Sequence, residues 1–256
     1  MGILNITKDS FSDGGLYLNP ENAKQQAQKM IEAGASIIDI GGESTRPGAE
    51  PVTIDDELNR VIPIIEHVSQ LNIPISIDTN KPEVMQAAVA AGASIVNDVW
   101  ALQKEGALEM AAKLEVPICL MHMQGSPQTM QDKPIYNDVV DDIIKFFKER
   151  ISSCKAAGIT EDKLILDPGF GFGKTQEHNL AMLKRLREFN VLKLPILAGM
   201  SRKSMIGSII NKPAEQRVSA SVALAILAWQ SGASFIRVHD VAETKDALDM
   251  VLAVNS

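Results

Sequence analysis

A short unit recurs along this sequence of 256 residues and limits its possible folds more than any other feature. The segment AGASIIDIG at residues 33–41 returns as AGASIVNDV at residues 91–99 and as SGASFIRVHD at residues 231–240, with a looser copy at residues 157–169. In each copy an amphipathic segment ends at a glycine, which tolerates the left-handed conformation that closes a helix. A short apolar run follows, so the repeat predicts alternating helices and strands.

Eight apolar runs of this kind occur, at residues 2–5, 36–40, 75–78, 94–97, 118–121, 164–167, 196–199 and 235–239. Their nearly continuous apolar character is typical of parallel strands covered on both faces. Helical patterns separate them, and the first opens with Asn19-Pro20 as an N-cap and N1 pair. Eight strands alternating with helices predict an α/β fold, namely a (β/α)8 TIM barrel with residues 1–256 as a single domain. A doubly wound open sheet is the alternative.

Composition excludes several classes of function. The net charge of −7 argues against a nucleic-acid-binding protein, which should carry a basic face. No apolar run approaches the ~20 residues of a membrane span, and the first residues lack the pattern of a signal peptide. The two cysteines, Cys119 and Cys154, stand in apolar stretches, which favours buried free thiols in a reducing, cytoplasmic compartment.

Polar residues stand at the carboxyl ends of the predicted strands, where enzymes of this architecture keep their active sites. The set consists of Asn5, Asp39, Asp78, Asn97, Asp167, Arg237 and His239, with Lys203 just beyond the seventh run. A polar residue in a buried strand is disfavoured, because a buried polar group without a partner costs roughly 1–3 kcal/mol. A single such residue could still be explained as a helix cap. So many together favour a binding site.

The residue types indicate the ligand. Carboxylates with an amide and a lysine suit a flat heterocycle rich in N–H donors, since one carboxylate accepts two parallel N–H bonds. The 2-amino-4-oxo edge of a pterin presents such a pair. Arg46, Arg237 and His239 suit a phosphorylated arm, and the last two share a strand face because they are two positions apart.

Three loop segments add to this pattern. NITKDSFSDGG at residues 5–15 and GGESTRPGAEPV at residues 41–52 are long, polar and glycine-rich, which favours mobile lids over ordinary solvated loops. GMSRKSMIG at residues 199–207 predicts a helix N-terminus at residues 201–204 that can bind an anion; the alternative is a serine cap with solvated Arg202 and Lys203.

GFGKT at residues 171–175 imitates a Walker loop, but Pro168 occupies the place of its first glycine, so we reject nucleotide binding.

The sequence contains MGILNITKDSFSDGG, DIGGESTRPGA, SIDTNKPEV, IVNDV, LMHMQGSPQTMQ, LDPGFGFGKTQEHN, GMSRKSMIG and IRVHDV, in this order. Together these segments resemble the dihydropteroate synthase family, in wording closest to its bacterial members, over essentially the whole chain. The resemblance implies a transferase of folate biosynthesis and a target of sulfonamides. It would condense 6-hydroxymethyl-7,8-dihydropterin pyrophosphate with 4-aminobenzoate by a dissociative displacement, and release pyrophosphate. It further implies Mg2+ as cofactor and a homodimer.

The same resemblance implies roles for individual residues. Those implied to bind the pterin are Asp39, Asp78, Asn97, Val99, Met121, Asp167, Phe172, Gly199 and Lys203. Those implied to bind pyrophosphate are Asn5, Arg46, Arg237 and His239, with Asn5 also touching Mg2+. Those implied for aminobenzoate are Phe11, Thr45, Pro47 and Ser204. The catalytic set comprises Asp13, Arg46, Lys203, Arg237 and His239.

One departure from the family and two alternatives remain. Lys8 stands where the family usually has proline, which would loosen the first loop and add a charge. A pterin-binding barrel without catalysis is one alternative, although the catalytic set is complete. A corrinoid-linked, pterin-dependent methyltransferase is the other, although such enzymes lack the ESTRPG and SRKS segments.

Overall fold

The computed structural model describes residues 1–6, 19–44, 49–126, 129–130 and 133–255. The strands are β1 (Gly2–Asn5), β2 (Ile38–Gly41), β3 (Ile75–Asp78), β4 (Ile95–Asp98), β5 (Ile118–Met121), β6 (Leu164–Asp167), β7 (Leu197–Ala198) and β8 (Phe235–Ile236). The α-helices are α1 (Pro20–Glu32), α2 (Ile54–Ser69), α3 (Pro82–Ala90), α4 (Ala107–Leu114), α5 (Val139–Ala156), α6 (Gln176–Lys184), α7 (Ser204–Ile210), α8 (Val218–Gln230) and α9 (Val241–Asn255). Short 3-10 helices occur at η2 (Glu161–Lys163), η3 (Leu186–Leu192) and η4 (Ala214–Gln216).

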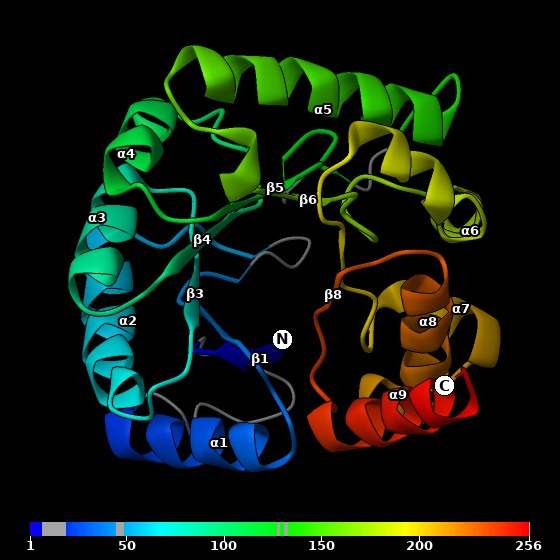
Figure 1. Ribbon diagram of the computed structural model, residues 1–256, viewed down its shortest axis with the longest axis horizontal. Coiled ribbons are helices and arrows are strands. Elements are labelled where there is room, and N and C mark those ends of the chain that lie inside the picture. The colour runs from blue at the N-terminus through cyan, green and yellow to red at the C-terminus, as the bar shows by residue number, and fades with distance from the viewer. Residues whose placement is uncertain (7–18, 45–48, 127–128, 131–132, 256) are drawn as a thin grey trace.

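The strands form a closed parallel barrel inside a ring of helices (Figure 1). Strands β1 to β6 pair in chain order, and β7 pairs with β8. A parallel bridge between Leu166 and Ile196 joins β6 to the β7 segment, and one between Gly2 and Val238 joins the end of β8 to β1. The pairing therefore returns to its start, which confirms the predicted (β/α)8 barrel and excludes the open sheet.

The local signals in the sequence produce the expected backbone. Gly34, Gly92, Gly158 and Gly232 have φ of 96°, 119°, 90° and 101°, as predicted for residues that close helices. The Asn19 side chain accepts a hydrogen bond from the Glu21 amide at 2.9 Å, and Pro20 begins α1. The helix starts and stops are therefore encoded locally.

The strand bounds differ from prediction at four places. The observed β2 and β4 lie one or two residues later than predicted, and β7 and β8 contain two residues each. The chain beyond β8 nevertheless continues to pair, since the Arg237 amide donates to the Ala198 carbonyl at 3.0 Å. The predicted runs are thus correctly placed, but the ladder is irregular where the barrel closes.

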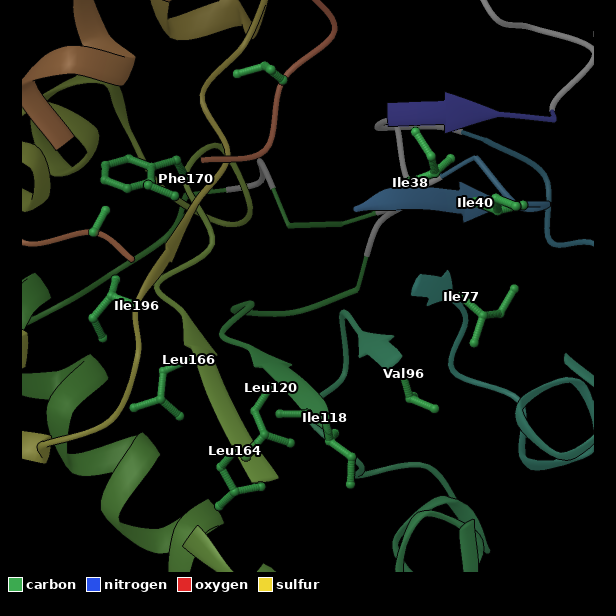
Figure 2. Packing of buried hydrophobic residues seen from close by; sticks show 14 of the residues in the cluster. Ile38, Ile40, Ile77, Val96, Ile118, Leu120, Leu164, Leu166, Phe170 and Ile196 are labelled. Carbon is green, nitrogen blue, oxygen red and sulfur yellow. The ribbon is translucent and has the colours of Figure 1, made fainter. Parts of the chain in front are cut away.

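Alternating strand residues divide the core into two layers. Side chains such as Ile38, Ile77 and Leu120 pack outward in the large cluster that the helices cover (Figure 2). The intervening Cys119, Ile165 and Leu197 form a separate small cluster with Met1 and Phe235 inside the barrel. The next inward residues, two positions further along the strands, lie at the carboxyl end of the barrel.

Two other expectations concern cysteines and membranes. Cys119 and Cys154 are both buried and free, as predicted. Among the described residues, no helix is both long and apolar enough to span a bilayer.

Candidate active site

Inward-facing polar side chains lie next to the small apolar cluster inside the barrel, on the side of the carboxyl ends of the strands. Asp167 stands two residues after Ile165, and Arg237 two residues after Phe235. The register places Gly41 beside Asp78, and Asp78 beside Asn97. Because parallel strands end at the same edge, the structure gathers these residues as the sequence predicted.

Arg237 is the centre of an ion-pair network. Its Nε donates to Oδ2 of Asp39 at 2.7 Å, and its Nη2 lies 3.0 Å from Oδ2 of Asp78. The Asp39 side chain is fully buried. Burial lowers the pKa of the guanidinium, but the two aspartates outweigh it and hold that pKa above its ordinary value. The guanidinium is therefore permanently charged; it compensates Asp39 and opposes the rise in the pKa of Asp78, which burial and the Asp39 charge still bring to about 8.

Three buried side-chain oxygens on inward-facing strand positions have no partner among the described residues. They are Oδ1 of Asp39, Oγ of Ser76 beside it in the register, and Oδ1 of Asn97. An unpaired buried acceptor costs free energy, so such atoms in a folded protein call for an explanation. N–H donors of a bound molecule would satisfy them.

Asp167 and Lys203 are two groups of opposite charge that affect each other's pKa. Oδ1 of Asp167 accepts the Gly169 amide at 2.8 Å. Burial raises the pKa of the Asp167 carboxyl, against the opposing effect of Lys203. Burial likewise lowers the pKa of Lys203 to about 8, against the effect of Asp167. Each group thus stabilises the charged form of the other.

Lys203 is held over an aromatic ring. Its Nζ donates to the Phe170 carbonyl and lies 4.6 Å from the centre of the Phe172 ring. The alternative of a solvated Lys203 is therefore wrong. Arg202 is not solvated either, because its Nε donates to Oδ2 of Asp240 at 3.1 Å.

His239 contacts Ser201. The Nδ1 of His239 lies 3.0 Å from the Ser201 hydroxyl, which also accepts the His239 amide at 3.2 Å. Burial and the neighbouring Arg237 lower the pKa of His239 to about 3. The imidazole is therefore neutral at physiological pH, and an incoming anion would raise its pKa.

The remaining predicted residues fall into three groups. Val99, Met121 and Gly199 are buried at strand ends, and Phe172 is half-buried beneath Lys203. Ser204 is exposed as the first residue of α7, which has only seven residues, so the helix itself offers little as an anion site. Outside the described residues lie Lys8, Phe11, Asp13, Thr45, Arg46 and Pro47.

No group of three or more histidine, cysteine, aspartate or glutamate side chains in the described part of the chain could hold a metal ion. Asn5 ends β1 next to Gly41 and offers one amide oxygen. Mg2+ commonly takes one or two protein oxygens and completes its shell with water and substrate phosphates. Asn5 therefore fits a Mg2+ ion that arrives with a pyrophosphate group, and not a protein cage.

Lys174 has a role that the sequence did not reveal. This lysine is buried, and its Nζ lies within 2.9 Å of His122 Nδ1 and of the Phe172 carbonyl. Burial lowers the pKa of its amine well below the ordinary value. The lysine of the Walker-like segment thus points inward and connects the loops that follow β5 and β6. This position agrees with the rejection of nucleotide binding.

A buried charge cluster just beyond β2 and β3 was also missed. Nζ of Lys81 contacts Oε2 of Glu43 at 2.5 Å and the carboxylate of Glu57, whose side chain is fully buried. Asp98 next to Asn97 is structural, since its carboxylate accepts the amides of Trp100 and Leu102 at 2.8 Å each. The charge of Glu57 inside the apolar pattern of α2 was the available signal.

Comparisons with known proteins agree on one family. The sequence profile described as pterin binding enzyme matches residues 1–239. The dihydropteroate synthase of Escherichia coli strain K12 is 52% identical over 257 residues, covering 100% of this chain and 91% of that protein. The dihydropteroate synthase of Haemophilus influenzae is 51% identical over 249 residues, covering 97% of this chain and 90% of that protein.

Solved structures give the same result. The Yersinia pestis dihydropteroate synthase with a sulfonamide drug complex has a TM-score of 0.97 and 53% identity, covering 100% of this chain and 93% of that one. The Xanthomonas albilineans dihydropteroate synthase in complex with 7,8-dihydropteroate has a TM-score of 0.90 and 47% identity, with the same two coverages.

Proposed function

The chain belongs to the dihydropteroate synthases within the family of pterin-binding enzymes, and from this premise we propose how its strand ends carry the reaction. It is a transferase that condenses 6-hydroxymethyl-7,8-dihydropterin pyrophosphate with 4-aminobenzoate to give 7,8-dihydropteroate and pyrophosphate. Neither the methyltransferase nor the barrel without catalysis is favoured, because whole-length relatives of about half identity are dihydropteroate synthases.

One observation carries the proposed placement of the pterin. The unpartnered acceptors of Asp39 and Asn97 lie at the same barrel end as the Asp167 carboxylate and the Lys203 amine. A pterin edge offers N–H donors for the acceptors and one carbonyl for the amine. Asp167 would accept the paired donors and Lys203 would donate to the carbonyl, so that ring binding satisfies groups the protein leaves buried and unpaired.

The pyrophosphate arm would lie toward Arg237, His239 and Asn5, with Arg46 from the second loop. A permanently charged guanidinium stabilises a phosphate dianion, and a neutral imidazole can donate one hydrogen bond to it. Mg2+ bound through Asn5 would neutralise charge on the departing pyrophosphate. Burial and Arg237 lower the pKa of His239. A bound anion would raise this pKa again, because its negative charge offsets that of Arg237.

The displacement breaks the bond between the pterin methylene carbon and the pyrophosphate oxygen, and both electrons leave with the oxygen. The electron-rich ring supports the resulting cation at the methylene. The aniline nitrogen of 4-aminobenzoate then supplies the electron pair for the new bond and releases a proton, in which step Asp13 would assist. Ser204, together with Phe11, Thr45 and Pro47, would hold the aminobenzoate.

We also propose a homodimer in the cytoplasm. Helices α7, α8 and α9 lie at one side of the barrel (Figure 1), and they carry the exposed apolar side chains Ile209, Leu227, Met250, Leu252 and Val254. A second copy of the chain would cover them. Sedimentation of the protein, compared with a Leu227→Glu variant, tests this; a wild type that sediments as a monomer would contradict it.

The test of the proposed function is pyrophosphate release from the pterin pyrophosphate, with and without 4-aminobenzoate, alongside chromatography of the product. Release that depends on aminobenzoate and yields dihydropteroate is the expected result. A Lys203→Met variant should lose most of this turnover. Binding of the pterin without any turnover would contradict the proposal and favour the non-catalytic barrel.

A further inference from the structure

One guanidinium connects the two ends of α7. Arg217, which directly precedes α8, donates from Nη1 to the carbonyls of Arg202 at 2.9 Å and Lys203 at 3.2 Å. Its Nε donates to the Lys212 carbonyl at 2.9 Å. The first two acceptors lie just before α7 and the third just after it, so Arg217 closes the segment from residue 202 to residue 212 into a ring.

Arg202 needs such support because its φ is 59°. The left-handed conformation is unfavourable for a residue with a side chain, and surrounding contacts must hold it. Ser221, one helical turn after Arg217 on α8, accepts the Arg202 amide at 2.9 Å, and Arg217 binds the Arg202 carbonyl. α8 therefore fixes Arg202 through both its amide and its carbonyl.

The conformation of Arg202 decides where the next two side chains begin. Lys203 leaves this turn toward the Phe170 carbonyl and the Phe172 ring, and Ser204 starts α7 immediately after it. A turn that relaxed toward ordinary φ would redirect both side chains. The guanidinium of Arg217 donates to backbone carbonyls, so it would act on this turn and not directly on the side chains of Asp167 and Lys203.

Gly207 is the counterpart that makes room for Arg217. A Cβ on Gly207 would lie 2.1 Å from Nη2 and 2.5 Å from Cζ of Arg217. Alanine is ordinarily the better residue inside a helix, so sterics and not helix propensity favour glycine here. The guanidinium occupies the space that a side chain at position 207 would take.

We propose that Arg217 is a positioning residue of the transferase, which sets Lys203 for the pterin and Ser204 for the aminobenzoate by holding Arg202 in its left-handed turn. This inference rests on the proposed roles of Lys203 and Ser204. It predicts that the loss of Arg217 weakens binding of both substrates together, although Arg217 touches neither.

The experiment compares Arg217→Ala, Gly207→Ala and the double variant with the wild type. The measured quantities are the Kd for a dihydropterin, the Michaelis constant for aminobenzoate, kcat and the unfolding midpoint. Arg217→Ala should raise the Kd and the Michaelis constant by about tenfold or more, as expected for a displaced binding group. Gly207→Ala should do the same by pushing the guanidinium away. The double variant should be no worse than Arg217→Ala, because the methyl group then meets empty space.

Arg187 provides the matched control. Its Nη2 donates to the Gln230 carbonyl at 2.9 Å, at the other end of α8. Arg187→Ala should leave the Kd and the Michaelis constant at wild-type values. Arg217→Lys keeps the positive charge but reaches fewer carbonyls, so it should fall between the wild type and Arg217→Ala and provides a test if the alanine variant does not fold.

Two results would overturn the proposal. One is an Arg217→Ala variant whose midpoint or kcat falls while both the Kd and the Michaelis constant stay unchanged, which would make Arg217 merely structural. The other is a double variant whose losses are the product of the single ones, which would mean that Gly207 and Arg217 act separately. A wild type that binds the pterin without turnover would instead refute the proposed function, while the Kd values would still test the positioning.

Discussion

Nε of Arg237 lies 2.7 Å from Oδ2 of Asp39, although 198 positions separate the two residues in the chain. Closure of the barrel brings β8 back beside the first strands, and the same guanidinium also reaches Asp78 at 3.0 Å. The family resemblance implies pyrophosphate binding and catalysis for Arg237, but no role in the pterin site. Its contacts mean that it also binds two carboxylates of the proposed pterin set.

Replacement of Arg237 by alanine should therefore make pterin binding depend on pH. Burial and the Asp39 charge raise the pKa of Asp78, and Arg237 is the cation that opposes them. Without Arg237 the folded-state pKa rises further, so the carboxyl stays protonated up to a higher pH. The pKa of Asp78 is already about 8 beside Arg237, so the loss of pterin affinity relative to the wild type should be greatest, about tenfold, just above pH 8 and should shrink at higher pH. Calorimetry across this range, with His239→Ala as the control, checks the prediction; a loss that is constant with pH would contradict it.

Lys203 should couple binding and stability to pH in opposite directions. Its pKa is lowered from 10.5 to about 8, so between these values the unfolded chain holds a proton that the folded chain has released. Stability should therefore rise with pH across this window, whereas pterin binding through the protonated amine should decline. Denaturant unfolding and calorimetry of the wild type and Lys203→Met measure both slopes. The variant should lose the Lys203 part of both slopes, while buried Lys174, whose pKa is also lowered, continues to contribute to the stability slope in both proteins. An equal slope in both proteins would refute the role of Lys203.

The sequence was sufficient for the barrel and for placing inward-facing polar residues such as Asp167 and Arg237 at its carboxyl end. Short apolar runs after glycines marked the strands, and strand parity put Asp167 and Arg237 on inward faces. Both signals are local, so they survive without knowledge of the fold.

The contacts within the site could not be predicted in the same way. Arg237 meets Asp39 only because the barrel closes, and Lys174 meets His122 across 52 positions. Such pairs depend on three-dimensional neighbours that no periodicity encodes. The short β7 and β8 were not predicted for the same reason, since they lie where the isolated bridges at Ile196 and Val238 complete the barrel.

Gly169 should be irreplaceable where Gly158 is not. Both have positive φ, of 72° and 90°, but a Cβ on Gly169 would lie 1.9 Å from the His122 carbonyl oxygen, whereas one on Gly158 would meet nothing within 4 Å. Gly158→Ala should cost about 1 kcal/mol from backbone conformation alone. Gly169→Ala should cost at least about 3 kcal/mol and disturb the amide that binds Asp167. Denaturant unfolding of both variants checks this, and equal losses would contradict it.

Lys81 should stabilise the fold through Glu57. The Glu57 side chain is fully buried, and burial raises its pKa against the effect of Lys81. Lys81→Met should cost about 3 kcal/mol, because it leaves a buried carboxylate unpaired. Adding Glu57→Leu to Lys81→Met should restore most of this stability. If the double variant is as unstable as Lys81→Met, the uncompensated charge is not the cause.

Asp167 offers the sharpest test of whether the inward polar residues at the barrel end bind the pterin. The carboxylate ends β6, and one oxygen already accepts the Gly169 amide at 2.8 Å. Asp167→Asn keeps the shape of the side chain but replaces one acceptor oxygen by a donor, so it cannot accept two parallel N–H bonds. The measurement is calorimetric titration of a dihydropterin into the wild type and Asp167→Asn at equal folded concentration. We expect the variant to lose about a hundredfold or more in affinity, in the range of a broken charge-assisted pair. An unchanged dissociation constant in a folded variant would show that the carboxylate only supports its own turn, and would contradict the proposed pterin site.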